Sequence, residues 1–321
     1  MGALAAVLGK GIGAVNGVFG DFLAQSGNGL AITLGFRTAD GTAVATDRAA
    51  LARHLGAAGG DVAIYLHGLC CDEQVWQLYR TPGVPTMPEA LQQTQGWTPV
   101  YVRYNSGRHI ADNGEDLADA LDRLVANWPV PVRRIALIGH SMGGLVARSA
   151  AHHALEANRV WPDRVTHLVC LGSPHHGAPL EKFGHVATTL LGALDITRPV
   201  AVAINARSVG IKDLRHGALR RDDWQSRHPD EHADDTRQPV RVLPKARHHY
   251  VGALLGATAE SLPSWLIGDG LVRAPSATGH HADDRRRVPF APGDGVMLPG
   301  LHHLKLVNHP AVAAHLLRWL A

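Results

Sequence analysis

Ser141 is the residue whose surroundings point most directly to chemistry. Residues 139–143 read Gly-His-Ser-Met-Gly, behind the apolar β-type run 135–138 and ahead of a helical pattern that opens at Leu145. Small residues on both sides of a serine permit a strained strand-to-helix turn, which lifts the hydroxyl clear of the sheet at the positive end of the next helix. We therefore predict that Ser141 is a nucleophile; the alternative is an N-cap serine in an ordinary βα unit.

A serine nucleophile needs a base that takes the hydroxyl proton and an acid that orients the base. Asp269 stands between two glycines after a predicted strand over residues 250–255, and we predict that it is the acid; the alternative is a simple turn aspartate. The base is expected near the C-terminus, where His302 and His303 follow a final short strand. We prefer His303, with His302 as the alternative and a purely structural pair as the third interpretation.

Two backbone amides are predicted to hold the oxyanion of the tetrahedral intermediate. The amide of Met142 lies at the start of the helix behind the serine, and the amide of Leu69 follows the end of a predicted strand. Other residues at or just beyond predicted strand ends are expected to border the same pocket without acting as the base. They are His67, Gly68, His140 and His175.

The elements that must position these residues alternate between strands and helices. Apolar runs and helical spacing predict strands over 61–66, 97–104, 134–138, 165–171 and 250–255, with helices over 113–128 and 143–155. Continuous apolar strands separated by helices indicate an α/β fold, a mainly parallel, doubly wound sheet covered on both faces. Ligands of such sheets bind outside the carboxyl ends of the strands, where Ser141 would lie.

We expect a single domain over residues 1–321. Its first 60 residues are expected to extend the core with a helix over residues 1–22, a hairpin of strands 30–36 and 42–45, and a short helix that begins after Asp47. The first helix is expected to dock on the body of the protein, with a partner or a lipid surface as alternatives.

Residues 179–245 interrupt the alternation of strands and helices. An apolar helical stripe runs through residues 183–194, whereas residues 222–238 are polar and loop-like. We predict that this insertion is a helical cap or lid over the site; a peripheral helix pair is the alternative.

Composition narrows the class of protein. Hydrophobic residues make up 45% and charged residues 18% of the chain, which is typical of a compact globular enzyme, and the formal charge of +3 with intermixed basic and acidic residues argues against a nucleic-acid partner. No uncharged apolar run has the length of a membrane span, although peripheral lipid contact is left open. We predict a soluble, cytoplasmic protein.

Cysteines and histidines give no sign of a metal site. The three cysteines are odd in number and lack metal-ligand spacing, so a reducing compartment is the simpler interpretation. Cys70 and Cys71 follow His67 closely, but we expect them to pack as small buried side chains rather than to act as thiols in the chemistry. Several of the 21 histidines stand in pairs, yet none shows the spacing of a zinc site, so we expect neither metal nor cofactor.

Five segments together resemble the α/β-hydrolase superfamily, and within it the lipase and GPI inositol-deacylase-like branch. The resemblance spans about Asp61 to Leu320, and its most specific part is the serine turn followed in order by Asp269 and His303. It implies Ser141 as nucleophile, Asp269 as triad acid and His303 as base, in agreement with the roles argued above. The segments are 66–68, 139–144, 172–177, 268–272 and 302–304.

These features predict a serine carboxylic-ester hydrolase that works through an acyl-enzyme on a small-molecule or lipid ester. An acyltransferase that uses the same acyl-enzyme is one alternative. A non-catalytic binding protein on the same fold is another. The length of the acyl chain and the oligomeric state do not follow from these residues.

Overall fold

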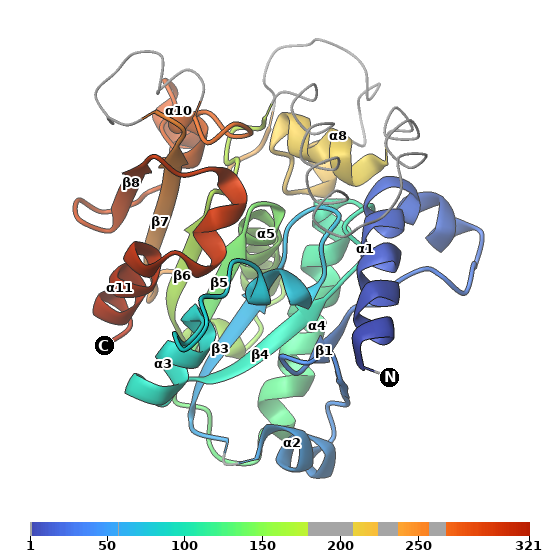
Figure 1. The fold of residues 1–321 in the computed structure, drawn as a ribbon. Coiled ribbons are helices and arrows are strands. Elements are labelled where there is room, and N and C mark those ends of the chain that lie inside the picture. The colour runs from blue at the N-terminus through green and yellow to red at the C-terminus, as the bar shows by residue number, and fades with distance from the viewer. Residues whose placement is uncertain (1, 57, 179–207, 224–236, 257–267) are drawn as a thin grey trace.

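The computed structural model describes residues 2–56, 58–178, 208–223, 237–256 and 268–321, with backbone alone for residues 2–11 (Figure 1). In this part of the chain, eight strands form one sheet in the order β2-β1-β4-β3-β5-β6-β7-β8. The strands are β1 (Gly35–Arg37), β2 (Ala43–Val44), β3 (Asp61–Leu66), β4 (Thr98–Arg103), β5 (Arg134–His140), β6 (Val165–Leu171), β7 (Arg247–Leu254) and β8 (Gly295–Pro299).

The sheet is parallel from β4 to β8, and β1 joins it antiparallel to β2 and β4. The predicted α/β class with a mainly parallel sheet is therefore confirmed. Because the parallel strands all point the same way, the residues that follow β3, β5, β6, β7 and β8 meet at one edge of the sheet.

Helices cover both faces of this sheet (Figure 1). On one face, Val62, Ile64 and Leu66 of β3 share a buried core with α4 and α5, and on the other, Ala63 and Tyr65 share a core with α3 and α11. This division follows from the period of two along a strand, which sends alternate side chains to opposite faces. The helices are α2 (Arg48–Leu55), α3 (Met87–Gln95), α4 (Ile110–Asn127), α5 (Met142–Glu156), α10 (Ala274–Ala277) and α11 (Pro310–Trp319).

The buried central strands were the most predictable elements. The predicted strands at 61–66 and 165–171 coincide with β3 and β6, whereas the predicted first hairpin strand at 30–36 shrinks to the three residues of β1. Short 3-10 helices also occur, and the sequence patterns did not predict them. They are η1 (Glu73–Gln77), η2 (Trp161–Arg164), η4 (Arg221–Asp223), η5 (Asp284–Arg286) and η6 (His303–Asn308).

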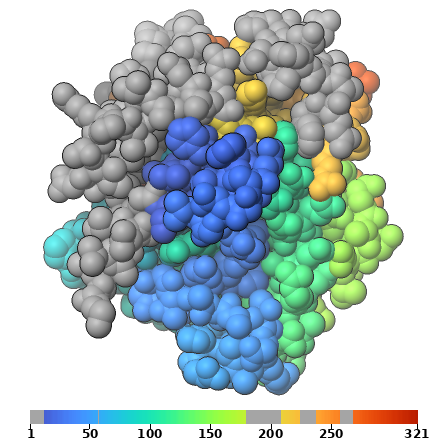
Figure 2. Space-filling model, turned by 90° about the vertical axis from the view of Figure 1, so that its right-hand side faces the viewer, coloured from blue at the N-terminus to red at the C-terminus, as the bar shows by residue number. Residues whose placement is uncertain are grey.

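The N-terminal helix α1 (Gly2–Gln25) lies against the body of the protein, and Figure 2 shows it crossing one side of the molecule. Its contacts are close ones: a Cβ atom on Gly17 would lie 2.3 Å from Sγ of Cys70, and the Gly20 carbonyl accepts a hydrogen bond from the Asn105 side chain at 2.9 Å. No helix in the described part of the chain is long and apolar enough to cross a bilayer. Cys70, Cys71 and Cys170 are all free and buried.

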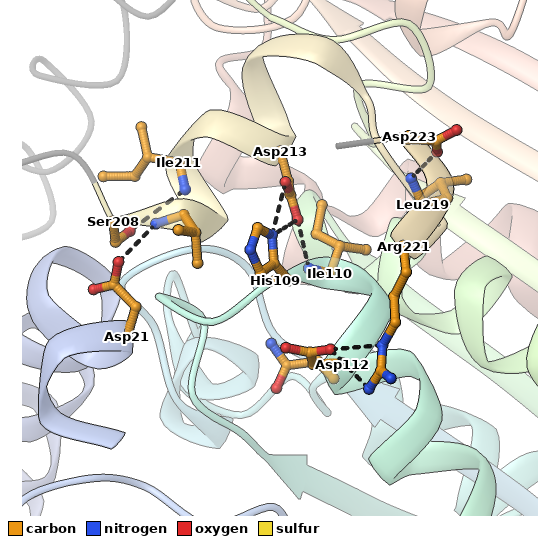
Figure 3. Close-up of polar contacts among 12 residues, drawn as sticks. Asp21, His109, Ile110, Asp112, Ser208, Ile211, Asp213, Leu219, Arg221 and Asp223 are labelled. Atoms are coloured by element: carbon orange, nitrogen blue, oxygen red, sulfur yellow. Dashed lines mark hydrogen bonds and ion pairs between the residues drawn. The ribbon is translucent and has the colours of Figure 1, made fainter. Parts of the chain in front are cut away.

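Part of the predicted cap is described, namely α8 (Val209–His216) and η4. Figure 3 shows α8 above the start of α4, where the buried Asp213 carboxylate accepts a hydrogen bond from the Ile110 amide at 2.8 Å and lies 3.1 Å from Nδ1 of His109. Asp21 of α1 accepts a hydrogen bond from the amide of Val209. The apolar stripe over 183–194 lies outside the described residues.

Candidate active site

Ser141 occupies a sharp turn between β5 and α5. Its φ of 55° and ψ of −122° lie in a backbone region that residues other than glycine rarely adopt. Its amide donates a hydrogen bond to the Leu171 carbonyl at 2.8 Å. Such backbone strain persists only where the surrounding structure imposes it, and it concentrates at functional sites. The serine is 6% exposed.

The glycines around Ser141 are required by close backbone contacts. A Cβ on Gly139 would lie 2.2 Å from the Gly144 nitrogen, and one on Gly143 would lie 2.3 Å from the Leu66 carbonyl oxygen. Real Cβ atoms are not found at such distances from the backbone, so no other residue fits without a shift of β3 or α5. The Gly-x-Ser-x-Gly spacing is thus a packing requirement of this turn.

Asp269 and His303 lie together, although 34 positions separate them in the chain. Nδ1 of His303 is 2.6 Å from Oδ2 of Asp269, and both side chains are buried. The other carboxylate oxygen accepts hydrogen bonds from the amides of Leu271 at 2.9 Å and Val272 at 2.8 Å. The carboxylate is therefore held from two sides, and its position keeps the ring proton of His303 on Nδ1.

Ser141 and His303 approach the same short segment at the end of β6. The serine amide bonds to Leu171, and a Cβ on Gly172 would lie 3.0 Å from Cε1 of His303. Nε2 of His303 is buried and has no hydrogen-bond partner among the described residues, so no bond to Ser141 is formed. The structure thus joins the two residues predicted as acid and base, and it places the serine on the same segment without a hydrogen bond to His303.

His302 points elsewhere, although it precedes His303 directly. Its ring lies edge-on to Tyr79, with 5.5 Å between the ring centroids, and its backbone forms the N-cap of η6. The turn of η6 separates the two side chains, so that only His303 reaches Asp269.

His67 and His140 are buried beneath the serine turn. His67 accepts a hydrogen bond from the Tyr104 amide through Nε2 and donates from Nδ1 to the Gly68 carbonyl; burial lowers its pKa to about 4. The pKa of His140 is lowered well below its ordinary value by burial and by the neighbouring His303, whose ring centroid is 4.8 Å away. Both rings are therefore neutral supports at neutral pH.

The two predicted oxyanion donors flank the serine. Met142 begins α5, where the amide has no partner within the helix, and Leu69 follows Gly68. A Cβ on Gly68 would lie 3.1 Å from Cβ of Ser141, so the backbone at Gly68 passes close to the serine. Neither amide donates a hydrogen bond to another of the described residues.

His175 lies away from this group, in a cavity of about 180 Å³ that none of Ser141, Asp269 and His303 lines. Its Nδ1 accepts a hydrogen bond at 2.9 Å from Arg148, a buried arginine of α5 that the sequence analysis overlooked. An arginine within the apolar pattern Leu145 to Ala151 was the signal that could have revealed it.

The comparisons with known proteins agree with this fold. Residues 102–234 match the family model described as the PGAP1-like alpha/beta domain. A GPI inositol-deacylase of Debaryomyces hansenii is 35% identical over 83 residues, and this match covers 25% of the chain but only 8% of that much longer protein.

Two solved structures have a related chain path. The lipase BlEst2 of Bacillus licheniformis in its mature form is 16% identical with a TM-score of 0.45, and the match covers 84% of this chain and 94% of that one. The phospholipase PlaB of Legionella pneumophila is 18% identical with a TM-score of 0.47, over 82% and 60% of the two chains. The fold assignment itself rests on the strand order and on the family match. The strand order is that of an α/β-hydrolase-like fold, and residues 102–234 are similar to the PGAP1-like alpha/beta domain.

Proposed function

We propose that the protein is a serine carboxylic-ester hydrolase of the esterase or lipase type, with Ser141 as nucleophile, His303 as base and Asp269 as the orienting acid. One observation carries this proposal: the carboxylate of Asp269 fixes the ring of His303 at 2.6 Å, while Nε2 of that ring has no partner among the described residues and lies next to the segment that holds the strained Ser141.

In the first half-reaction, Nε2 of His303 takes the hydroxyl proton while Oγ of Ser141 bonds to the ester carbonyl carbon. Asp269 stabilises the imidazolium that forms. The imidazolium then gives its proton to the leaving alkoxide, the carbon–oxygen bond of the ester breaks, and an alcohol departs from the acyl-enzyme. In the second half-reaction, Nε2 of His303 takes a proton from a water molecule whose oxygen bonds to the acyl carbon. The bond between that carbon and Oγ of Ser141 then breaks, Oγ receives the proton, and the carboxylic acid departs.

The oxyanion of each tetrahedral intermediate would be held by the amides of Leu69 and Met142. These donors are fixed by the backbone, so they need no reorganisation when charge develops on the oxygen. Loss of one such donor in a serine hydrolase lowers the rate about 10²–10³-fold, so the path of the Gly68–Leu69 backbone matters to the activity even though it carries no reactive side chain.

Acyl esters are the favoured substrate class. The curated relative is named a deacylase, and an ester needs a less demanding leaving-group step than an amide because an alkoxide leaves more readily than an unprotonated amine. Small-molecule esters and lipid esters both fit this chemistry.

A series of p-nitrophenyl esters graded by acyl-chain length tests the proposal. We expect turnover by the wild type, loss of turnover in Ser141→Ala, and no loss in Ser26→Ala, which removes an exposed hydroxyl in the turn after α1. A fluorophosphonate probe should label the wild type and not Ser141→Ala. Undiminished hydrolysis by Ser141→Ala would contradict the assignment, and absence of both labelling and turnover would favour a non-catalytic role.

A further inference from the structure

The cavity beside Arg148 has five arginines among its lining residues. It has a volume of about 180 Å³, and it lies between α5, the segment after β6, the described end of the cap and η5. Its charged and imidazole side chains are Arg148, His175, His176, Asp223, Arg237, Arg285, Arg286 and Arg287.

The acidic groups near this cavity are already engaged. Oδ2 of Asp223 accepts hydrogen bonds from the amides of Leu219 and Arg220, and its Oδ1 accepts one from Gln238. The arginines of η5 and its end pair with their own neighbours: Arg285 and Arg286 with Asp283, and Arg287 with Asp284.

Arg148 differs from these surface arginines. It is 8% exposed, and among the described residues no carboxylate lies within ion-pair distance of it. The titratable groups that interact with it are His175, His176, His248, Arg237 and Cys170. Burial raises the pKa of the Cys170 thiol to about 12, so the thiol is neutral and cannot act as the counter-ion.

Two hydrogen-bond donors in the cavity wall are left unsatisfied. Nη1 of Arg148 donates to Nδ1 of His175 at 2.9 Å, and this bond places the proton of the imidazole on Nε2. Nε of Arg148 and Nε2 of His175 are both buried and have no partner in the described part of the chain. A buried donor without a partner, and still more a buried cation without a counter-charge, destabilises the folded state unless a ligand binds to it.

We propose that this cavity is an anion site that binds a phosphate group, with the guanidinium of Arg148 and Nε2–H of His175 as its inner donors and Arg237 at its side. A tetrahedral oxyanion matches the planar fork of an arginine, and it would neutralise a charge that no carboxylate in the described part of the chain neutralises. Arg237 is positioned for this role, since its Nη1 donates to the carbonyl oxygen of His175 at 3.1 Å.

The phosphate could be free in solution or belong to a lipid headgroup, because the donors recognise the same oxygens in both. The site is independent of the proposed ester hydrolysis, since Ser141, Asp269 and His303 do not line the cavity. Binding can therefore be measured without turnover.

Calorimetric titration of the full chain with inorganic phosphate is the first test. We expect binding by the wild type, a rise of about tenfold or more in Kd for Arg148→Met, and no change for Arg53→Met, which removes an exposed arginine of α2. If Arg148→Met fails to fold, the half-buried Arg237→Met replaces it, with the same expected direction.

The second arm uses vesicles containing phosphatidic acid, with phosphatidylserine vesicles of equal surface charge as the control. Ser141→Ala is the background, so that the lipids stay intact. Preference for phosphatidic acid that depends on Arg148, without binding of free phosphate, would identify a headgroup site; binding of free phosphate would identify a soluble ligand. If neither form binds, or if binding is equally strong after loss of Arg148 and of Arg237, the proposal is overturned.

Discussion

His303 is attached to Asp269 twice, through Nδ1 to the carboxylate at 2.6 Å and through its backbone amide to the Asp269 carbonyl at 3.3 Å. The second bond fixes the backbone that carries the imidazole, while the first fixes the ring. Asp269 and the start of η6 are therefore tied together, and the orientation of the proposed base is set by both main chain and side chain.

Replacement of Asp269 by asparagine tests this relationship. Asp269→Asn keeps the shape of the side chain but removes the negative charge and can turn an amide donor toward Nδ1, which would favour the wrong tautomer of His303. We expect kcat for p-nitrophenyl ester hydrolysis to fall about 10⁴-fold, as in other serine triads. Asp163→Asn, at an exposed carboxylate that pairs with Lys245, is the matched control. Wild-type kcat in Asp269→Asn would exclude the carboxylate from the mechanism.

The glycines of the serine turn should be intolerant of even one methyl group. Gly143→Ala places a Cβ 2.3 Å from the Leu66 carbonyl oxygen, so either β3 or α5 must move. We expect the free energy of unfolding in urea to fall by about 3 kcal/mol, together with loss of esterase activity. Gly29→Ala, where a Cβ meets nothing within 4 Å, should leave both unchanged. A fully stable Gly143→Ala would mean that the turn is less tightly packed than described.

The parts of the fold that could be predicted are those fixed by local sequence. The strand at 61–66 is apolar throughout because both its faces are buried, and the turn at Ser141 follows from glycines within a few positions of it. By contrast, α4 begins three residues before the predicted Asn113, because Asp213, more than a hundred positions away, accepts the amide of Ile110. No pattern near residue 110 contains that information.

The same reasoning applies to the site. Two adjacent histidines are equivalent in a sequence, and only the turn of η6 brings His303, rather than His302, onto Asp269. Arg148 left a local signal, a cation within the apolar pattern of α5, but its pairing with His175 depends on how α5 packs against the segment after β6. The sequence near Arg148 therefore marks it as unusual without naming its partner.

Buried neutral histidines should lower the free energy of unfolding at acidic pH. Burial lowers the pKa of His67 to about 4, whereas an unfolded chain protonates the same ring near pH 6.5. Between these two pKa values the unfolded state binds more protons than the folded state. The contribution of His67 to the free energy of unfolding is therefore complete above pH 6.5 and is lost as the pH drops toward 4. His67 alone would contribute a loss of about 3 kcal/mol over this range.

Urea denaturation at a series of pH values measures this effect. His67→Gln should be less stable than the wild type at pH 8, since it disturbs the bonds to Tyr104 and Gly68, but its stability should fall less steeply between pH 6.5 and 4. His280→Gln, at an exposed histidine, is the control and should keep the wild-type slope. An unchanged slope in His67→Gln would show that the ring is not buried neutral in solution.

Helix α8, in the described part of the predicted cap, should depend on Asp213 for its attachment. This buried carboxylate accepts the Ile110 amide at 2.8 Å and contacts His109, which ties α8 to the first turn of α4 (Figure 3). Asp213→Ala leaves the Ile110 amide and the His109 ring without their acceptor, so we expect the free energy of unfolding to fall by about 1–3 kcal/mol and limited proteolysis to cut faster within residues 208–223. Asp222→Ala removes a mostly exposed carboxylate of η4 that pairs with Arg220, and it should alter neither property. Equal rates of cleavage in Asp213→Ala and in the wild type would mean that other contacts, such as the hydrogen bond from the Val209 amide to Asp21, hold α8 in place.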